Sequence, residues 1–265
     1  MFKYVSILSL LCLLGNICFA DDKKTESFDS SITDSSYPLM IWEKLDSKKS
    51  PEVIVNFINK DGYDAVENGV LISRRHVLMS ANYACYVMKN IRSFRVTAGK
   101  RTMGVKSIVA PSNFDCYNPT CDKSAILILT LSGKVKGNKL YRISKSAKRI
   151  KKNALVRITG FGGAGDNDRF GLLKWAKTKI EKIDKYWAIL TPYLNRFHYT
   201  NNEGATIITV QVPNPKNNKK VWAVAAMGTC YNESTNVKKD KVLMLARKDL
   251  IKFIKKATEG TAKFI

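Results

Sequence analysis

The chain has 265 residues, of which 45 are Lys or Arg and 22 are Asp or Glu, so its formal net charge is +23 with His neutral. Hydrophobic residues make up 45% and charged residues 25% of the chain, which excludes an intrinsically disordered protein and provides enough apolar side chains for a core. One large all-β unit and two ordinary domains are both compatible with this length.

The first twenty residues are typical of a secretory signal peptide. Lys3 precedes an apolar run from Val5 to Leu14, and small residues stand before Asp21. The apolar run is too short to cross a bilayer, and no other segment of the sequence is long and apolar enough to do so. We therefore expect an exported, extracellular protein that loses residues 1–20 and has no transmembrane segment.

The next segment, residues 21–36, differs sharply from the rest of the chain. It contains five acids, two lysines and five serines, a composition typical of a flexible leader. The remaining residues, 37–265, hold 42 basic and 17 acidic residues, a formal charge of +25. The excess positive charge therefore belongs to the part of the chain that is expected to fold.

Short apolar runs separated by Gly, Asn, Asp, Lys or Pro dominate the rest of the sequence and predict β-strands. In chain order, the expected strands are residues 52–58, 69–72, 76–81, 94–98, 125–131, 155–161, 187–191, 206–212 and 221–227. Helical spacing appears only near the end, where Leu250, Ile251, Ile254 and Ala257 recur among lysines. Many short strands favour barrels or sandwiches over a sheet built from βαβ units.

Six segments carry a resemblance to one family. They are GVLISRRHVLMSA (69–81), IVAPSNFD (108–115), SAILIL (124–129), VRITGFG (156–162), LLK (172–174) and VAAMGTC (224–230). In order and spacing they resemble segments of the chymotrypsin/trypsin-like serine proteases, over about residues 37–257. The resemblance implies an all-β fold of two packed six-stranded antiparallel β-barrels (trypsin-like) with a C-terminal α-helix. It places the first barrel at about 37–132, a basic crossover at about 133–153, the second barrel at about 154–245 and the helix at about 247–258.

The resemblance also implies which residues stand at the family's catalytic positions. Asn82 stands at the position of the base, Lys123 with the adjacent Asp122 at that of the orienting carboxylate, and Gly204 at that of the nucleophile. An amide does not exchange protons near neutral pH, and glycine carries no nucleophile, so the Ser-His-Asp mechanism of this family lacks its parts. We therefore expect a catalytically inactive homologue without a cofactor or a metal.

The two histidines of the chain do not replace the missing base in this alignment. His76 corresponds to a buried Trp of the family and is expected to have a structural role. His198 corresponds to the floor of the primary specificity pocket and is expected to be exposed.

Cysteines remain at four positions after the signal peptide: Cys85, Cys116, Cys121 and Cys230. An even number in an oxidising compartment fits two disulfides in any of three connectivities, or a free pair. No His or second Cys pair accompanies the C-x4-C spacing, so a zinc site is not expected. The resemblance places the loop of Cys85 opposite the loop of the C-x4-C pair, which favours a bridge between them. Asn232 begins the single N-glycosylation pattern.

Basic residues concentrate in and around the crossover: residues 123–165 contain 11 Lys or Arg and no acid. Such a run is usually a solvated face, but a domain of charge +25 repels itself and would be stabilised by a polyanion. No element for reading DNA or RNA sequence is visible. The candidate polyanion-binding residues are Lys134, Lys136, Lys139, Arg142, Lys145, Lys148, Arg149, Lys151, Lys152, Lys252, Lys255 and Lys256.

The leading hypothesis is a secreted, monomeric, non-catalytic serine protease homologue that acts by binding. Its partner is expected to be an extracellular protein of a protease or immune cascade, or a polyanion such as a sulfated glycosaminoglycan, for which heparin is the usual probe. A basic antimicrobial or membrane-binding protein is the alternative. An enzyme with displaced chemistry, using Asp122 and Glu203, is a third hypothesis.

Overall fold

The structure is a computed structural model that describes residues 43–44, 49–59, 61–81, 84, 87–116, 122–161, 173–190, 207–217, 219–231 and 240–265. All of them belong to the second of two units into which the chain divides, Tyr37–Ile265. The strands are β1 (Glu43–Lys44), β2 (Glu52–Ile58), β3 (Asp64–Leu71), β4 (His76–Ser80), β5 (Arg95–Ala98), β6 (Arg101–Val109), β7 (Ile126–Leu131), β8 (Arg142–Ile143), β9 (Leu155–Gly160), β10 (Lys174–Asp184), β11 (Trp187–Leu190), β12 (Ile207–Pro213), β13 (Lys220–Tyr231) and β14 (Asp240–Met244). The helices are α1 (Lys248–Ala257) and two short 3-10 turns, η3 (Ile91–Ser93) and η4 (Ala147–Arg149).

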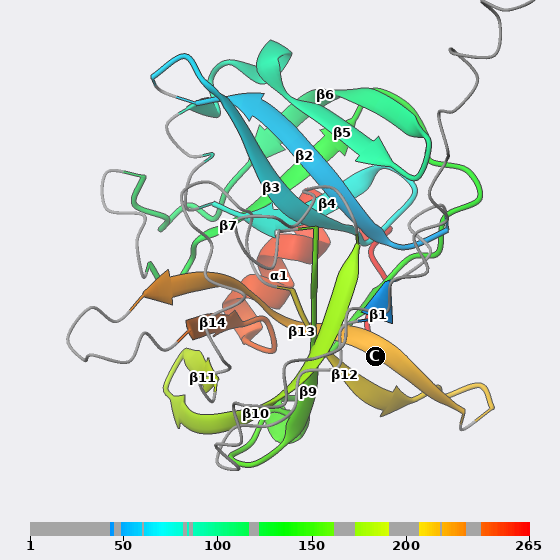
Figure 1. Cartoon of the computed structure of the whole chain (residues 1–265), viewed down its shortest axis with the longest axis vertical. Coiled ribbons are helices and arrows are strands. Elements are labelled where there is room, and N and C mark those ends of the chain that lie inside the picture. Colours follow the sequence, from blue (N-terminus) through cyan, green and yellow to red (C-terminus); the bar gives the residue numbers. More distant parts are fainter. Residues whose placement is uncertain are drawn as a thin grey trace, which may run out of the picture. The chain divides into compact units, whose positions relative to one another are not determined.

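Two closed barrels account for most of these strands (Figure 1). The first barrel closes in the order β2-β3-β4-β7-β6-β5. The second closes in the order β9-β10-β11-β14-β13-β12, because β12 and β10 both pair with β9. All pairings within the two rings are antiparallel, while β1 pairs with β10 and β8 pairs in parallel with β13 outside the rings. The predicted fold, two six-stranded antiparallel barrels with a C-terminal helix, is therefore confirmed.

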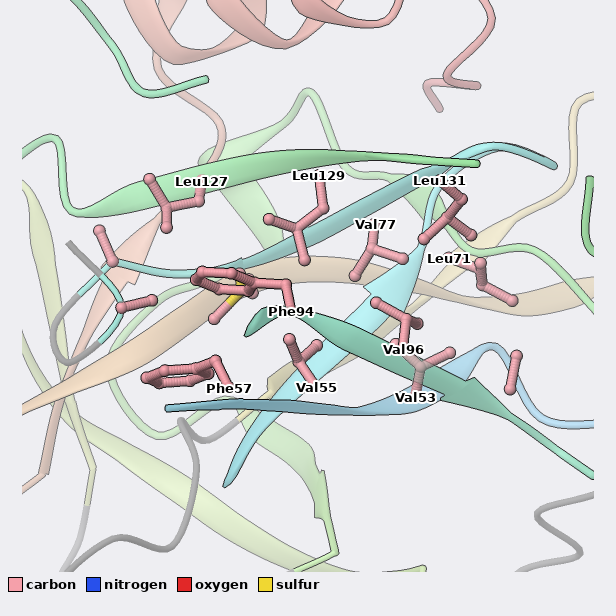
Figure 2. Close-up of a cluster of buried hydrophobic side chains, with 14 of the residues drawn as sticks. Val53, Val55, Phe57, Leu71, Val77, Phe94, Val96, Leu127, Leu129 and Leu131 are labelled. Atoms are coloured by element: carbon pink, nitrogen blue, oxygen red, sulfur yellow. The ribbon is translucent and has the colours of Figure 1, made fainter. Parts of the chain in front are cut away.

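Alternating side chains of the strands fill the interior of the first barrel, as the period of two in a β-strand requires. In β2, Val53, Val55 and Phe57 point inward and are buried, whereas the residues between them are half-buried. Figure 2 shows the ring of Phe57 beside that of Phe94, with ring centroids 5.0 Å apart and planes inclined by 15°. Burial of these apolar side chains is the main favourable term in folding of this barrel.

The strands β4 and β7 are buried on both faces because they also contact the second barrel. Leu127 and Leu129 of β7 point into the first barrel, whereas Ile126 and Ile128 belong to a separate cluster with side chains of the second barrel. Helix α1 contributes Leu250 and Ile254 to that cluster, and the crossover contributes Tyr141 and Ile143. The sequence of a strand that is buried on both faces is a continuous apolar run, such as ILIL in β7.

Several strands were not predicted from the sequence. In β6, every residue is half-buried or exposed, so no apolar face marks it as a strand. In β10, lysines interrupt an 11-residue strand that was not expected. The predicted strand 69–72 covers only the end of β3, which starts five residues earlier, and β14 was not expected either. Pairing with neighbouring strands keeps these segments extended, and such pairing is not a local property of the sequence.

Helix α1 matches its expected range within one residue at each end. Its buried residues, Leu250 and Ile254, are four positions apart and lie on one face, as helical geometry requires. Among the described residues, no helix has the length and apolar content needed to cross a membrane.

Candidate functional site

Asn82 and Gly204, which the resemblance predicts at the positions of the base and the nucleophile, lie outside the described residues. So do Glu203, His198 and the glycosylation candidate Asn232. Their predicted roles therefore stay predictions. The described neighbours are Ala81, which follows β4, and Ile207, which opens β12.

Asp122 and Lys123, which the resemblance predicts at the position of the orienting carboxylate, are described. One carboxylate oxygen of Asp122, Oδ1, accepts the backbone N–H of Ser124 at 2.5 Å, so this carboxylate stabilises its own turn. The carbonyl of Lys123 accepts a hydrogen bond from Nη1 of Arg247. The Nζ atom of Lys123 lies 6.0 Å from the ring centroid of Tyr186, and the guanidinium of Arg247 lies 4.5 Å from the same centroid. Lys123 and its neighbour Arg247 therefore both approach the ring of Tyr186.

His76 is buried, with 8% of its surface exposed. Its Nδ1 lies 2.7 Å from Oγ of Ser73 and 3.2 Å from Oγ1 of Thr261, so the ring connects β4 to the segment after α1. Burial lowers the pKa of His76 below its usual value, the carboxylate of Glu259 opposes this, and the guanidinium of Arg75 lowers the pKa further. The lowered pKa favours the neutral form of this ring, which lies between two hydroxyl groups.

Only two of the four cysteines considered above are among the described residues. Cys116 is half-buried, and Cys230 lies in β13 with its backbone paired to Lys241. Cys85 and Cys121 lie outside the described residues, so the bridge between the two loops stays a prediction.

The crossover, residues 133–153, holds most of the candidate polyanion-binding residues and is fastened at both flanks. On one side, β8 pairs with β13. On the other side, residues 143–145 form backbone hydrogen bonds of 2.8 to 2.9 Å with residues 263–265. The chain segment after α1 therefore lies beside the crossover.

The basic residues of the crossover fall into groups with different neighbours. Nη1 of Arg74 donates to the carbonyl of Asn138, which attaches the stretch bearing Lys134 and Lys136 to the loop before β4. Arg142 is half-buried and donates to Oδ1 of Asn214 at 3.1 Å. Helix residues Lys252 and Lys256 line a separate groove against residues 109–113, and Nζ of Lys255 lies 5.6 Å from the ring of Phe264.

The last group is the densest, and we call it the crossover patch: Lys145, Lys148, Arg149, Lys151 and Lys152. All five side chains are exposed, and they surround the short turn η4. Within the described part of the chain, none of the five has a carboxylate at ion-pair distance. Like charges held close together on a rigid turn repel one another, and an external anion would relieve that repulsion.

A cleft of about 730 Å³ lies next to the start of the crossover. Segments 49–52, 139–141 and 221–222 line it together with Arg157, and we call it the basic cleft because Lys49, Lys139 and Arg157 are among its lining residues. Glu52, which also lines this cleft, is buried with 1% of its surface exposed. Its Oε1 accepts the hydroxyl of Tyr141 at 2.5 Å, and its Oε2 accepts the hydroxyl of Ser50.

The guanidinium of Arg157 is held in one orientation in this cleft. Its Nη2 donates to Oη of Tyr141 at 2.7 Å, and its Nε donates to Oγ1 of Thr209 at 3.1 Å. The same group lies 4.2 Å from the ring centroid of Trp222. Burial raises the pKa of Tyr141 well above its usual value, and the charge of Glu52 raises it further, while Arg157 opposes the shift. Tyr141 therefore stays a neutral phenol that donates to Glu52.

Sequence reasoning missed the basic cleft because its parts come from four distant segments. Tyr141 and Glu52 are 89 positions apart, and Arg157 and Thr209 are 52 apart. The available signal was weak: an acidic residue at the start of an apolar strand, Glu52, departs from the usual composition of buried positions.

Neither a family model nor a curated protein matches this sequence. The architecture fits a trypsin-like fold, since two six-stranded antiparallel barrels with a C-terminal helix are present. Among the described residues, no group of three or more His, Cys, Asp or Glu side chains gathers as a metal site would require.

Proposed function

We propose that this protein is an extracellular, non-catalytic homologue of the trypsin-like serine proteases that binds sulfated glycosaminoglycans. The observation that carries the binding proposal is the crossover patch, where five exposed cations surround one turn without a carboxylate partner among the described residues. The surrounding unit of charge +25 adds a long-range attraction for polyanions. Sulfate groups repeat along such a polymer, so one chain contacts several of these cations at once.

The non-catalytic part of the proposal rests on the residues at the family's catalytic positions, Asn82 and Gly204. We expect the mature protein, residues 21–265, to hydrolyse neither peptide nor ester substrates and to remain unlabelled by a serine-directed fluorophosphonate, because neither side chain supplies a base or a nucleophile. Intact-mass spectrometry after incubation measures the labelling, with an active trypsin-like protease as the positive control. Stoichiometric addition of one phosphonate would contradict the proposal and favour an enzyme with displaced chemistry.

The binding part is tested by retention of the mature protein on immobilised heparin. We expect elution well above the physiological ionic strength of about 0.15 M. Each neutralised sulfate releases condensed counterions, so the logarithm of the affinity should fall linearly with the logarithm of the salt concentration. Elution below physiological ionic strength contradicts the proposal. Tighter binding to anionic lipid vesicles than to heparin at equal salt also contradicts it and favours the membrane-binding alternative.

A further inference from the structure

The basic cleft has the size and lining of a site for a small ligand. Its volume of about 730 Å³ lies within the range of about 300 to 1,000 Å³ that is usual for small-molecule sites. Pro51, Leu140 and Val221 provide an apolar wall, and Trp222 is half-buried beside them. An apolar wall with an aromatic edge suits the C–H face of a sugar ring, while the cations of the lining suit an acidic substituent.

The charges that line the basic cleft are unequal. The carboxylate of Glu52 is buried, and both of its oxygens already accept hydroxyl groups from Ser50 and Tyr141. In contrast, Lys49 and Lys139 are exposed, and a backbone hydrogen bond of 2.9 Å from the N–H of Lys139 to the carbonyl of Lys49 holds their segments together. Among the described residues that line the cleft, Glu52 is the only one with a carboxylate, and its oxygens are already engaged, so a ligand meets the cations of this lining.

The guanidinium of Arg157 has the donor geometry that suits a planar or tetrahedral oxyanion. A guanidinium has five N–H groups in a rigid fork, and within the described residues only two of those of Arg157 donate hydrogen bonds. The contact with the ring of Trp222 and the hydrogen bonds to Thr209 and Tyr141 restrict its rotation, so little conformational freedom remains to be lost on binding. No described residue accepts from Nη1, so its N–H groups can bind a ligand oxygen.

We infer that the basic cleft binds a single acidic sugar unit, whose carboxylate or sulfate is held by Arg157 and flanked by Lys49 and Lys139. This inference rests on the proposed function, which names a sulfated glycosaminoglycan as the source of the ligand. It goes beyond that function because it assigns a second site, which selects a saccharide rather than any polyanion. Because Lys139 and Tyr141 belong to the crossover, the same segment carries the crossover patch and one wall of the cleft.

The test is binding of a heparin-derived sulfated uronate disaccharide to the full mature protein by isothermal titration calorimetry at about 0.15 M salt, the physiological ionic strength. A non-sulfated uronate disaccharide and a neutral disaccharide of the same length are the comparison ligands. Both acidic disaccharides are expected to bind, and their relative affinities tell whether the carboxylate or the sulfate is the main contact. Equal binding of the neutral disaccharide, or no binding of either acidic one, overturns the inference.

Two variants locate the ligand. Arg157→Lys keeps the charge but removes the fork, and we expect the affinity for the acidic disaccharide to fall at least about tenfold. The double variant Lys49→Gln/Lys139→Gln changes only exposed side chains and is expected to weaken binding about three- to tenfold without lowering the thermal midpoint, which keeps the test valid if Arg157→Lys does not fold. Unchanged affinity in the double variant overturns the assignment to this cleft.

The crossover patch supplies the control that separates the two sites. Replacing its five residues by Gln should weaken retention on heparin while leaving the affinity for the disaccharide within about twofold, since none of the five lines the cleft. If heparin is retained but no acidic disaccharide binds, the inference fails and the proposed function stands. If the disaccharide binds in the cleft but heparin is not retained, the proposed function fails and the cleft stands as a site.

Discussion

Replacing Lys145, Lys148, Arg149, Lys151 and Lys152 together by Gln is expected to lower the affinity for heparin at least fivefold and to flatten its salt dependence. Exposed ion pairs contribute about 0.2–1 kcal/mol each, so five of them contribute about 1–5 kcal/mol, and about 1.4 kcal/mol corresponds to a factor of ten. The salt slope should decrease because fewer counterions are released. The measurement is the dissociation constant for heparin at several salt concentrations.

A matched control removes the same charge from other places. Lys89, Lys100, Arg101, Lys106 and Lys182 are equally exposed, and none belongs to the crossover or to the basic cleft. Changing these five to Gln lowers the net charge by the same amount and should weaken binding much less. Equal losses in the two variants would mean that affinity follows net charge alone and that the crossover patch is not a site. Thermal midpoints of both variants should stay close to that of the parent, since all ten side chains are exposed.

Replacing Phe94 by Ala is expected to lower the free energy of unfolding by about 3–5 kcal/mol. The side chain is fully buried in the first barrel and stacks on Phe57 (Figure 2). Its removal takes away apolar contacts and leaves a cavity, because the strands of a closed barrel cannot move inward to fill the space. A loss of this size is a large part of the 5–15 kcal/mol that usually separates folded and unfolded domains. Urea unfolding followed by circular dichroism measures it.

Leu155→Ala is the control for this stability measurement. Leu155 is 58% exposed at the start of β9, so its truncation should change the free energy of unfolding by about 0.5 kcal/mol or less. A loss below about 1 kcal/mol for Phe94→Ala, with an unchanged dependence on urea, would contradict the packing described for the first barrel. Strand β5 pairs with β2, and β2 begins at Glu52, which lines the basic cleft. Loosening of this barrel should therefore also lower the affinity of the basic cleft for its ligand.

The candidate sites differ in how far the sequence could reveal them. The crossover patch is visible as five cations within eight residues, because charge density along a chain is a local property. Its position beside residues 263–265 depends on backbone hydrogen bonds between segments more than 100 positions apart. The basic cleft has no such local signal, since Glu52, Tyr141, Arg157 and Trp222 acquire their roles only when two barrels and the crossover meet.

The sequence by itself determined the strands whose side chains alternate or run apolar, such as β2 and β7, and the helix α1, because burial of one face leaves a period of two or of 3.6. Only the tertiary structure decided the strands β6 and β10, whose exposed and basic residues give no period and whose conformation comes from pairing with neighbours. It also decided that Glu52 is buried. A carboxylate can occupy such a place because Ser50 and Tyr141 donate to it, and those donors come together only in the folded chain.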